Sequence, residues 1–249
     1  MTSWGVVLEQ VTSDWEHTSE HTLERISLQL DITGETTFFP LVGPNHQGKS
    51  TLLYVFSALK WPSQGSVKWI FPNGKTFIWG NARLIRPSDA VTLRRDYFGF
   101  AFQSSSLCPY LTAVENVAYP LQLQGMSWKS AFDKAQTTLT EVFFPETKNE
   151  IIPFLHYFPH QLSGDQQQQI AIAQAIIHDP YVLFADELTE LNPPVREQIM
   201  KVIKRWVEHA SGERCLIWVA SPKDLDLIAP KQLIWMDYQT CCIQKNFKP

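Results

Sequence analysis

The sequence predicts an α/β fold with a mixed, mostly parallel sheet, an antiparallel β edge and an inserted helical subdomain. Two short apolar runs, 181–185 and 216–220, do not alternate with polar residues, which is typical of strands buried on both faces of a parallel sheet. Residues 1–35 and 65–80 have instead the pattern of strands and turns. Between residues 104 and 163 helical periodicity replaces the strand pattern, so we expect a helical subdomain there.

The elements before this subdomain can be taken in order. Residues 35–42 are expected to form a strand that leads into a loop, and residues 51–59 a helix that leaves it. Proline cannot donate to a sheet ladder, so Pro40 predicts a local irregularity just before the loop. Asn73-Gly74 lies between two strand patterns and predicts a hairpin.

Helical periodicity marks residues 114–119 and 128–140 of the expected subdomain. A run of four glutamines, 166–169, lies inside an apolar helix that we expect over 166–177. The simplest interpretation of the run is helix surface.

Composition and charge exclude several function classes. Of the 249 residues, 44% are apolar, which is ample for a core. A formal charge of −4 and scattered Lys and Arg do not give the electrostatic footprint of a nucleic-acid binder. No apolar run approaches the ~20 residues that span a bilayer, and the N-terminus does not read as a signal peptide, so we expect a cytosolic chain without direct membrane insertion. The four cysteines do not have zinc-site spacing.

Residues 43–51 carry the most specific motif, which we call the phosphate loop. They fit G-x-x-x-x-G-K-[ST], whose backbone N–H groups and following helix are aimed at a nucleotide β-phosphate. Lys49 would reach the β and γ oxygens, Ser50 would bind Mg²⁺, and a Cβ at position 48 would obstruct the phosphate. The candidate nucleotide-binding residues are therefore Gly43, Pro44, Asn45, His46, Gln47, Gly48, Lys49, Ser50 and Thr51.

Two carboxylates, Asp186 and Glu187, end the apolar strand downstream. Asp186 would hold Mg²⁺, generally through water, and Glu187 would polarise the attacking water as general base. Alone, the pair could equally be solvated acids after a strand. Behind a phosphate loop, the catalytic interpretation is favoured.

Residues 162–166 read Leu-Ser-Gly-Asp-Gln and open the helix before the acidic strand. Here the chain resembles the ATP-binding subunits of ABC transporters, whose signature reads LSGGQ. The resemblance covers nearly the whole chain. It implies a single domain, 1–249, in which 1–103 and 164–249 form a P-loop NTPase core and 104–163 the helical subdomain, with ATP and Mg²⁺ as ligands.

The resemblance also assigns roles to single residues. Gln103 falls in the family's Q-loop, where a glutamine contacts Mg²⁺ and the attacking water and links the core to the subdomain. Trp15 falls where an aromatic residue stacks on adenine, although packing remains the alternative for one of nine tryptophans. In this family ATP lies between two subunits in a head-to-tail dimer. The signature residues Ser163, Gly164 and Gln166 would thus face a nucleotide held by the second subunit.

Residues 94–103 and 111–121 are similar to the branch that serves lipoprotein release, macrolide export and the cell-division complex. This implies ATP hydrolysis coupled to the work of a transmembrane permease subunit in export or envelope processes. A second ATP-binding subunit, identical or a paralogue, completes the dimer. The chain would be cytoplasmic and peripheral on the inner face of the cell membrane. Cargo and direction stay open.

Three positions depart from the family. Asp165 replaces the second glycine of the signature, Asn192 stands where the D-loop has aspartate, and Ser221 stands at the position of the switch histidine. An ionised Asp165 about 4 Å from a γ-phosphate charge would be repelled by about 4 kcal/mol at an effective dielectric near 20. Binding is therefore better supported than turnover. The alternatives are a regulatory ABC subunit that scarcely hydrolyses ATP and a soluble ABC-type ATPase without a permease. Lesser departures are His46 for glycine, and Gln169 and Gln174 for arginine.

Overall fold

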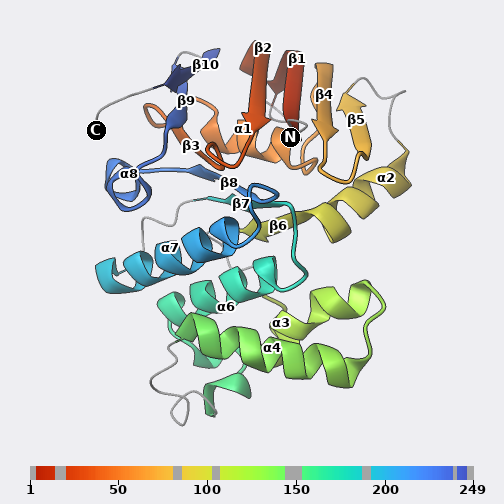
Figure 1. The fold of residues 1–249 in the computed structure, drawn as a ribbon, viewed down its shortest axis with the longest axis vertical. Coiled ribbons are helices and arrows are strands. Elements are labelled where there is room, and N and C mark those ends of the chain that lie inside the picture. The colour runs from red at the N-terminus through yellow and green to blue at the C-terminus, as the bar shows by residue number, and fades with distance from the viewer. Residues whose placement is uncertain are drawn as a thin grey trace.

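The computed structural model describes residues 4–14, 21–80, 86–102, 107–143, 153–186, 192–237 and 240–245. Strands occupy the upper part of the molecule in Figure 1, and the helices α3 (Ala113–Leu123), α4 (Trp128–Phe143) and α6 (Gly164–Ile176) occupy the lower part. Over those ranges no helix is both long and apolar enough to cross a bilayer.

Four antiparallel strands form one sheet, in the order β2-β1-β4-β5. They are β1 (Trp4–Asp14), β2 (His21–Ile32), β4 (Gln64–Ile70) and β5 (Thr76–Gly80). The hairpin predicted at Asn73-Gly74 joins β4 to β5. Gly74 has a φ of 78°, and the Phe71 N–H donates to the Lys75 carbonyl oxygen at 2.9 Å. The expected antiparallel edge is thus a sheet of its own.

The second sheet has six strands in the order β10-β9-β3-β8-β7-β6. All pairs are parallel except β10 with β9. Every residue of β7 and β8 is buried, as the unbroken apolar runs predicted. The six strands are β3 (Phe38–Val42), β6 (Phe98–Ala101), β7 (Val182–Ala185), β8 (Cys215–Val219), β9 (Gln232–Asp237) and β10 (Thr240–Lys245).

Pro40 lies in the central strand β3. Pairing with β8 runs without a shift from Phe38 to Leu41, so the predicted irregularity is absent on that side. The carbonyls of Thr37 and Leu41 accept hydrogen bonds from the β8 side, so the nitrogen of Pro40 is directed at β9. Pairing with β9 begins only at Leu41. The missing N–H of the proline therefore removes no bond from either ladder.

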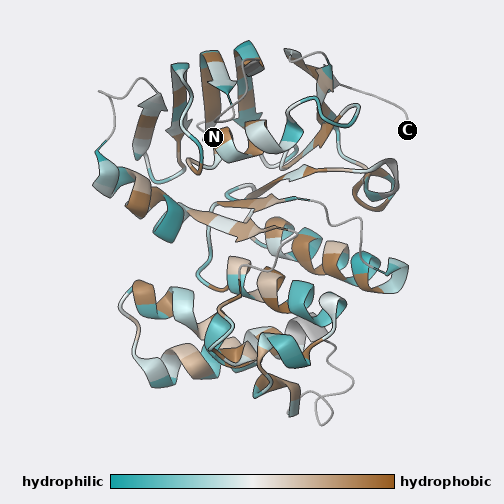
Figure 2. Ribbon diagram, turned by 180° about the vertical axis from the view of Figure 1, so that it is seen from behind, coloured by the Kyte–Doolittle hydropathy of each residue, from teal (hydrophilic) through white to brown (hydrophobic). Residues whose placement is uncertain are grey.

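Helix α1 (Lys49–Phe56) lies between the two sheets, as Figure 1 shows. Alternate residues of β7 point to opposite cores. Phe184 packs with Trp69 and Phe56 on the side of α1, whereas Leu183 packs with Ile203 on the side of α6 and α7. Accordingly, much of the middle strands is coloured brown, for hydrophobic residues, in Figure 2. The remaining helices of the sheet region are α2 (Pro87–Thr92), the π-helix η1 (Leu93–Tyr97), α7 (Pro193–Glu208) and α8 (Pro222–Ile228).

Helix α6 is packed on two sides. Ala171 joins a core with α3 and α4, and Ile172 joins the core that lies against the sheet and α7. Gln168 and Gln169 are consequently only 6% and 4% exposed, so the interpretation of the glutamine run as helix surface is wrong for these two residues. A local pattern does not reveal that a helix has neighbours on both faces.

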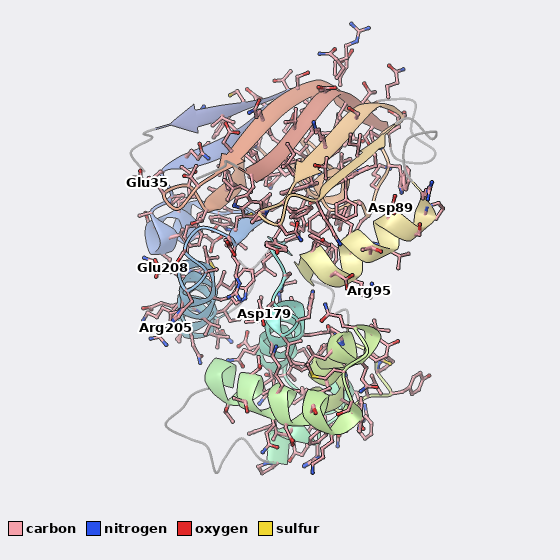
Figure 3. All side chains as sticks on the ribbon, turned by 45° about the vertical axis from the view of Figure 1, so that its right-hand side comes forward. Glu35, Asp89, Arg95, Asp179, Arg205 and Glu208 are labelled. Carbon is pink, nitrogen blue, oxygen red and sulfur yellow. The ribbon has the colours of Figure 1, made fainter. Side chains whose placement is uncertain are left out.

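The described residues between 107 and 163 form α3, α4 and short helical turns, including η3 (Pro159–Gln161). Asp179, labelled in Figure 3, lies between this helical part and the sheets. Its carboxylate accepts from Lys134 of α4 at 3.2 Å and from Arg214, which precedes β8, at 3.0 Å. The exact limits of the subdomain, 104 and 163, stay a prediction.

Candidate nucleotide site

A cavity of about 840 Å³, which we call the loop cavity, opens where β3 and β8 end and the phosphate loop begins. All predicted residues of the loop line it except Pro44 and Gln47. The carboxyl ends of parallel strands are where ligands bind in open α/β sheets. The sequence motif and the fold thus point to the same place.

Lys49 holds the loop closed. Its ammonium Nζ donates to the carbonyl oxygens of Gly43 at 2.9 Å and Pro44 at 2.6 Å. These bonds keep the charge inside the loop and beside the cavity. The loop is therefore shaped in advance for an anion.

The start of helix α1 adds to this preference. The Leu52 N–H donates to the Gly48 carbonyl oxygen at 2.8 Å, and the first turn carries no acidic side chain. Ser50 and Thr51, both in this turn, line the cavity. Backbone N–H groups and the helix dipole at such an end favour bound phosphate.

Two glycines let the loop lie against neighbouring strands. Gly48 has a φ of 86°, and a Cβ there would lie 2.7 Å from the Thr22 carbonyl oxygen of β2. Gly43 has a φ of 150°, and a Cβ there would lie 2.0 Å from the Met236 carbonyl oxygen of β9. We predicted that a side chain at 48 would obstruct the phosphate. The protein backbone already forbids it.

Ser221, at the switch position, also lines the loop cavity. Its backbone N–H and its hydroxyl both donate to Asp224 Oδ2, at 2.8 and 2.9 Å. Asp224 is fully buried, and its other oxygen lies 3.8 Å from Nε of Arg196 in α7. The side chain at this position is therefore hydrogen-bonded to a buried carboxylate, which in turn lies near a partly buried arginine.

The signature residues cap helix α6. The Gln166 N–H donates to Ser163 Oγ at 3.2 Å, and the Ser163 N–H donates to Gln166 Oε1 at 2.9 Å. Gly164 faces open space, because a Cβ added there would meet nothing within 4 Å. This end of α6 leaves room for a partner at Gly164. Nucleotide contact by these three residues stays a prediction.

Asp165 does not stand alone. One of its carboxylate oxygens accepts a short hydrogen bond from the side-chain amide of Asn192, and the other accepts from the Asn192 backbone N–H at 3.4 Å. Two of the three departures from the family are thus in direct contact. The repulsion calculated above assumed that the Asp165 carboxylate faces a phosphate. In the structure the carboxylate faces Asn192 instead.

The glutamines at the two family arginine positions make helix contacts. Gln174 donates from Nε2 to the Asn116 carbonyl oxygen of α3 at 3.1 Å, and Gln169 Nε2 lies 3.5 Å from Gln198 Oε1 of α7. Both positions therefore serve the packing of α6.

Asp186 follows β7 and is 7% exposed. Its backbone N–H donates to the Ala101 carbonyl oxygen at 3.2 Å, which extends the pairing with β6. The carboxylate of Asp186 and the hydroxyl of Ser50 are the kinds of oxygen donor that Mg²⁺ prefers, so these residues fit the metal in their chemistry. Trp15, Gln103 and Glu187 lie outside the described residues, and their roles stay predictions.

Sequence reasoning missed several residues that line the cavity. Val219 and Ala220 could have been found, because they end a predicted strand of the parallel sheet. Thr22 and Trp235 have no local signal. Trp235 is brought to the loop by the pairing of β9 with β3, in which it lies opposite Val42.

Comparisons with known proteins agree with this geometry. A family model described as ABC transporter matches residues 23–190. The ABC transporter ATP-binding protein MJ0796 of Methanocaldococcus jannaschii is 32% identical over 203 residues, 80% of each chain. The lipoprotein-releasing system ATP-binding protein LolD of Aquifex aeolicus is 31% identical over 201 residues, 80% of this chain and 82% of LolD.

A longer relative and a solved structure extend the match. The macrolide export ATP-binding/permease protein MacB of Marinobacter nauticus is 32% identical over 196 residues, 79% of this chain but 28% of MacB. The dimeric post-hydrolysis structure of MJ0796 bound to ADP and Pi superimposes with a TM-score of 0.78 at 27% identity, covering 98% of this chain and 100% of that one. The predicted fold and the branch resemblance are confirmed. The chain therefore belongs to the ABC transporter family, as an ATP-binding subunit of its ATPase class.

Proposed function

We propose that this chain binds Mg·ATP in the loop cavity and that closure of an ATP-loaded dimer drives conformational work in a membrane permease subunit. The observation that carries the proposal is the phosphate loop, in which Lys49 is held beside the 840 Å³ cavity by two carbonyls. When bound, Mg²⁺ would neutralise phosphate charge during transfer. Ser50 and Asp186 are the residues that would hold it.

A second ATP-binding subunit is required for closure. The solved MJ0796 structures are dimeric, which supports a dimer of this chain with itself or with a paralogue. Gly164 faces open space at the start of α6, as a surface that receives a partner must. Ser163, Gly164 and Gln166 would then meet the nucleotide of the second subunit, and Trp15 would stack on adenine.

Hydrolysis by such a dimer is expected to be slow. The switch position carries a serine bonded to Asp224, which offers no imidazole to the γ-phosphate. Glu187 supplies the general base and Gln103 contacts Mg²⁺ and the attacking water in this proposal. The chemistry is therefore impaired rather than lost.

The permease would dock at a second cavity of about 320 Å³, which we call the α3 groove. Tyr119 and Leu123 of α3 line it and are 46% and 52% exposed. The name of MacB joins an ATP-binding part, which this chain matches, to a permease. A permease partner would place the chain on the inner face of the cell membrane.

ATP binding is tested by Lys49→Ala. Without its ammonium the loop loses the group that contacts the β and γ oxygens, so calorimetry should show affinity for Mg·ATP falling at least ~100-fold, or about 2.7 kcal/mol. Lys129→Ala, which removes an exposed lysine of α4, is the matched control and should bind normally. Equal affinity for Mg·ATP in wild type and both variants would contradict the proposal.

Docking is tested by Tyr119→Glu and Leu123→Glu. Copurification with a membrane protein should be lost while calorimetric affinity for ATP is unchanged. Glu115 is unsuitable for this test, because its carboxylate accepts from the Thr112 N–H at 2.8 Å and caps α3. Trp61→Glu, at a 38% exposed residue outside the groove, is the control. Binding of the pure chain to protein-free liposomes would contradict a permease partner.

A further inference from the structure

The contact between Asp165 and Asn192 joins two helices. Asp165 lies in the first turn of α6, and Asn192 is the N-cap of α7, 27 residues later. Both carboxylate oxygens of Asp165 are used, one by the side-chain amide and one by the backbone N–H. The carboxylate is therefore directed at the start of α7.

The start of α7 has no negative charge of its own, because its first turn has no acidic side chain. Pro193 and Pro194 follow Asn192 and have no N–H to donate, so the donors to the Asp165 carboxylate are the backbone N–H and the side-chain amide of Asn192. The positive end of a helix dipole is stabilised by a nearby carboxylate. Asp165 supplies that charge from another helix.

The identity of residue 192 decides whether this arrangement can exist. The amide of asparagine donates a hydrogen bond, whereas a carboxylate at the same place has no donor and carries a like charge. An aspartate at 192, the family residue, would therefore repel Asp165. The two departures are compatible together, and aspartate at both positions is not.

We propose that Asn192 is a positioning residue that holds the Asp165 carboxylate against α7 within its own chain. The effect of this contact on the dimer rests on the function proposed above. A carboxylate bound in this way does not face the nucleotide phosphate that a second subunit presents to the signature. Asp165 and Asn192 are thus a matched pair, and each is tolerated because of the other.

The contact itself is tested in the isolated full-length chain without nucleotide. Asn192→Asp, Asp165→Gly and the double variant are compared with wild type by thermal unfolding. Asn192→Asp should lower the midpoint in the wild-type background and should have little effect in the Asp165→Gly background. Gln136→Glu, the same amide-to-carboxylate change on the exposed face of α4, should leave the midpoint unchanged. Equal effects in both backgrounds would overturn the pairing.

Salt gives a readout that a merely structural role would not move. The decrease in unfolding midpoint caused by Asn192→Asp should become smaller between about 0.1 M and about 1 M NaCl, because the Debye length falls from about 10 Å to about 3 Å. Asn192 is exposed, so ions can reach the pair. A decrease in midpoint that does not depend on salt would count against charge repulsion as its cause.

The consequence is tested by ATP-driven dimerisation of the same four proteins, each also carrying Glu187→Gln to prevent turnover. Sedimentation should show dimerisation weakened at least ~10-fold by Asn192→Asp alone and restored to within ~3-fold of Asp165→Gly in the double variant. An Asn192→Asp loss that Asp165→Gly does not rescue would overturn the proposal. If no protein dimerises with ATP, the proposed function fails, while the unfolding series still decides whether the pair exists.

Discussion

His46 shows at the scale of one residue how this phosphate loop differs from a glycine-rich one. Its φ is 63°, in the left-handed region that side chains other than Gly, Asn, Asp and His seldom adopt. Histidine is tolerated there, but a β-branched side chain is not.

The first prediction concerns this position. His46→Val should lower the free energy of unfolding by about 1–2 kcal/mol relative to His46→Gly, because the left-handed conformation penalises the branched Cβ. Urea unfolding of the nucleotide-free chain measures the difference. Equal stability of the two variants would show that the loop adapts its backbone to the side chain.

His178 is a second residue whose surroundings fix its chemistry. Its Nε2 donates to the Phe98 carbonyl oxygen at 3.0 Å, and burial lowers the pKa of the imidazole below its usual 6.5. Asp179 and Asp96 oppose this shift of the pKa, whereas Lys134 adds to it. Because the folded-state pKa is the lower one, the unfolded chain binds more protons between the two pKa values, and stability there rises with pH.

The second prediction follows from that sign. The stabilisation from neutral His178 is complete above about pH 6.5 and is lost as the pH falls toward the folded-state pKa. Wild type should therefore lose more unfolding free energy than His178→Gln between about pH 7.5 and about pH 5.5. The pH slope, rather than absolute stability, is the measurement. Identical pH slopes in wild type and His178→Gln would mean that other groups cause the loss of stability at acid pH.

At the scale of elements, α7 and α8 are joined by Arg196 and Asp224. The two side chains are 11% and 0% exposed, and Asp224 also holds Ser221 at the cavity. The same helix α7 carries an exposed pair, Lys201 with Glu197, at 2.7 Å. The two pairs therefore differ in burial, and the buried pair has the longer N···O distance, 3.8 Å.

The third prediction uses this internal comparison. Arg196→Ala should cost about 3–5 kcal/mol, because it leaves the Asp224 charge buried without its cation. Lys201→Ala, at a pair 64% and 50% exposed, should cost less than about 1 kcal/mol. Urea unfolding of both variants is the check. A similar cost for both would mean that water reaches Asp224.

At the scale of the whole molecule, the function proposed above requires a dimer in which the loop cavity of each chain meets the signature of the other. The fourth prediction is that this dimer releases phosphate more slowly than about 1 s⁻¹, the low end of common turnover numbers. Ser221→His should increase the rate by restoring the group that contacts γ-phosphate. Steady-state phosphate release measures this, with Glu187→Gln as the blank. Faster turnover in wild type, with no gain in the variant, would show that the serine is compensated elsewhere.

The sequence by itself determined the phosphate loop, the buried strands at 181–185 and 216–220 and the helices near 51–59, 114–119, 128–140 and 166–177, because each depends on a pattern in neighbouring residues. Lys49 and Ser50 lie in the cavity where the motif predicted them. The hairpin at Asn73-Gly74 depends on local turn chemistry and was predicted for the same reason.

Only the tertiary structure decided what lies beside these elements. The pairing of β9 with β3 brings Trp235 to the cavity, and the packing of α6 against α7 brings Asp165 to Asn192. The same packing buries Gln169 in a run that reads as surface. Contacts between segments distant in sequence depend on how faces of helices and strands meet, and no local periodicity records which faces those are.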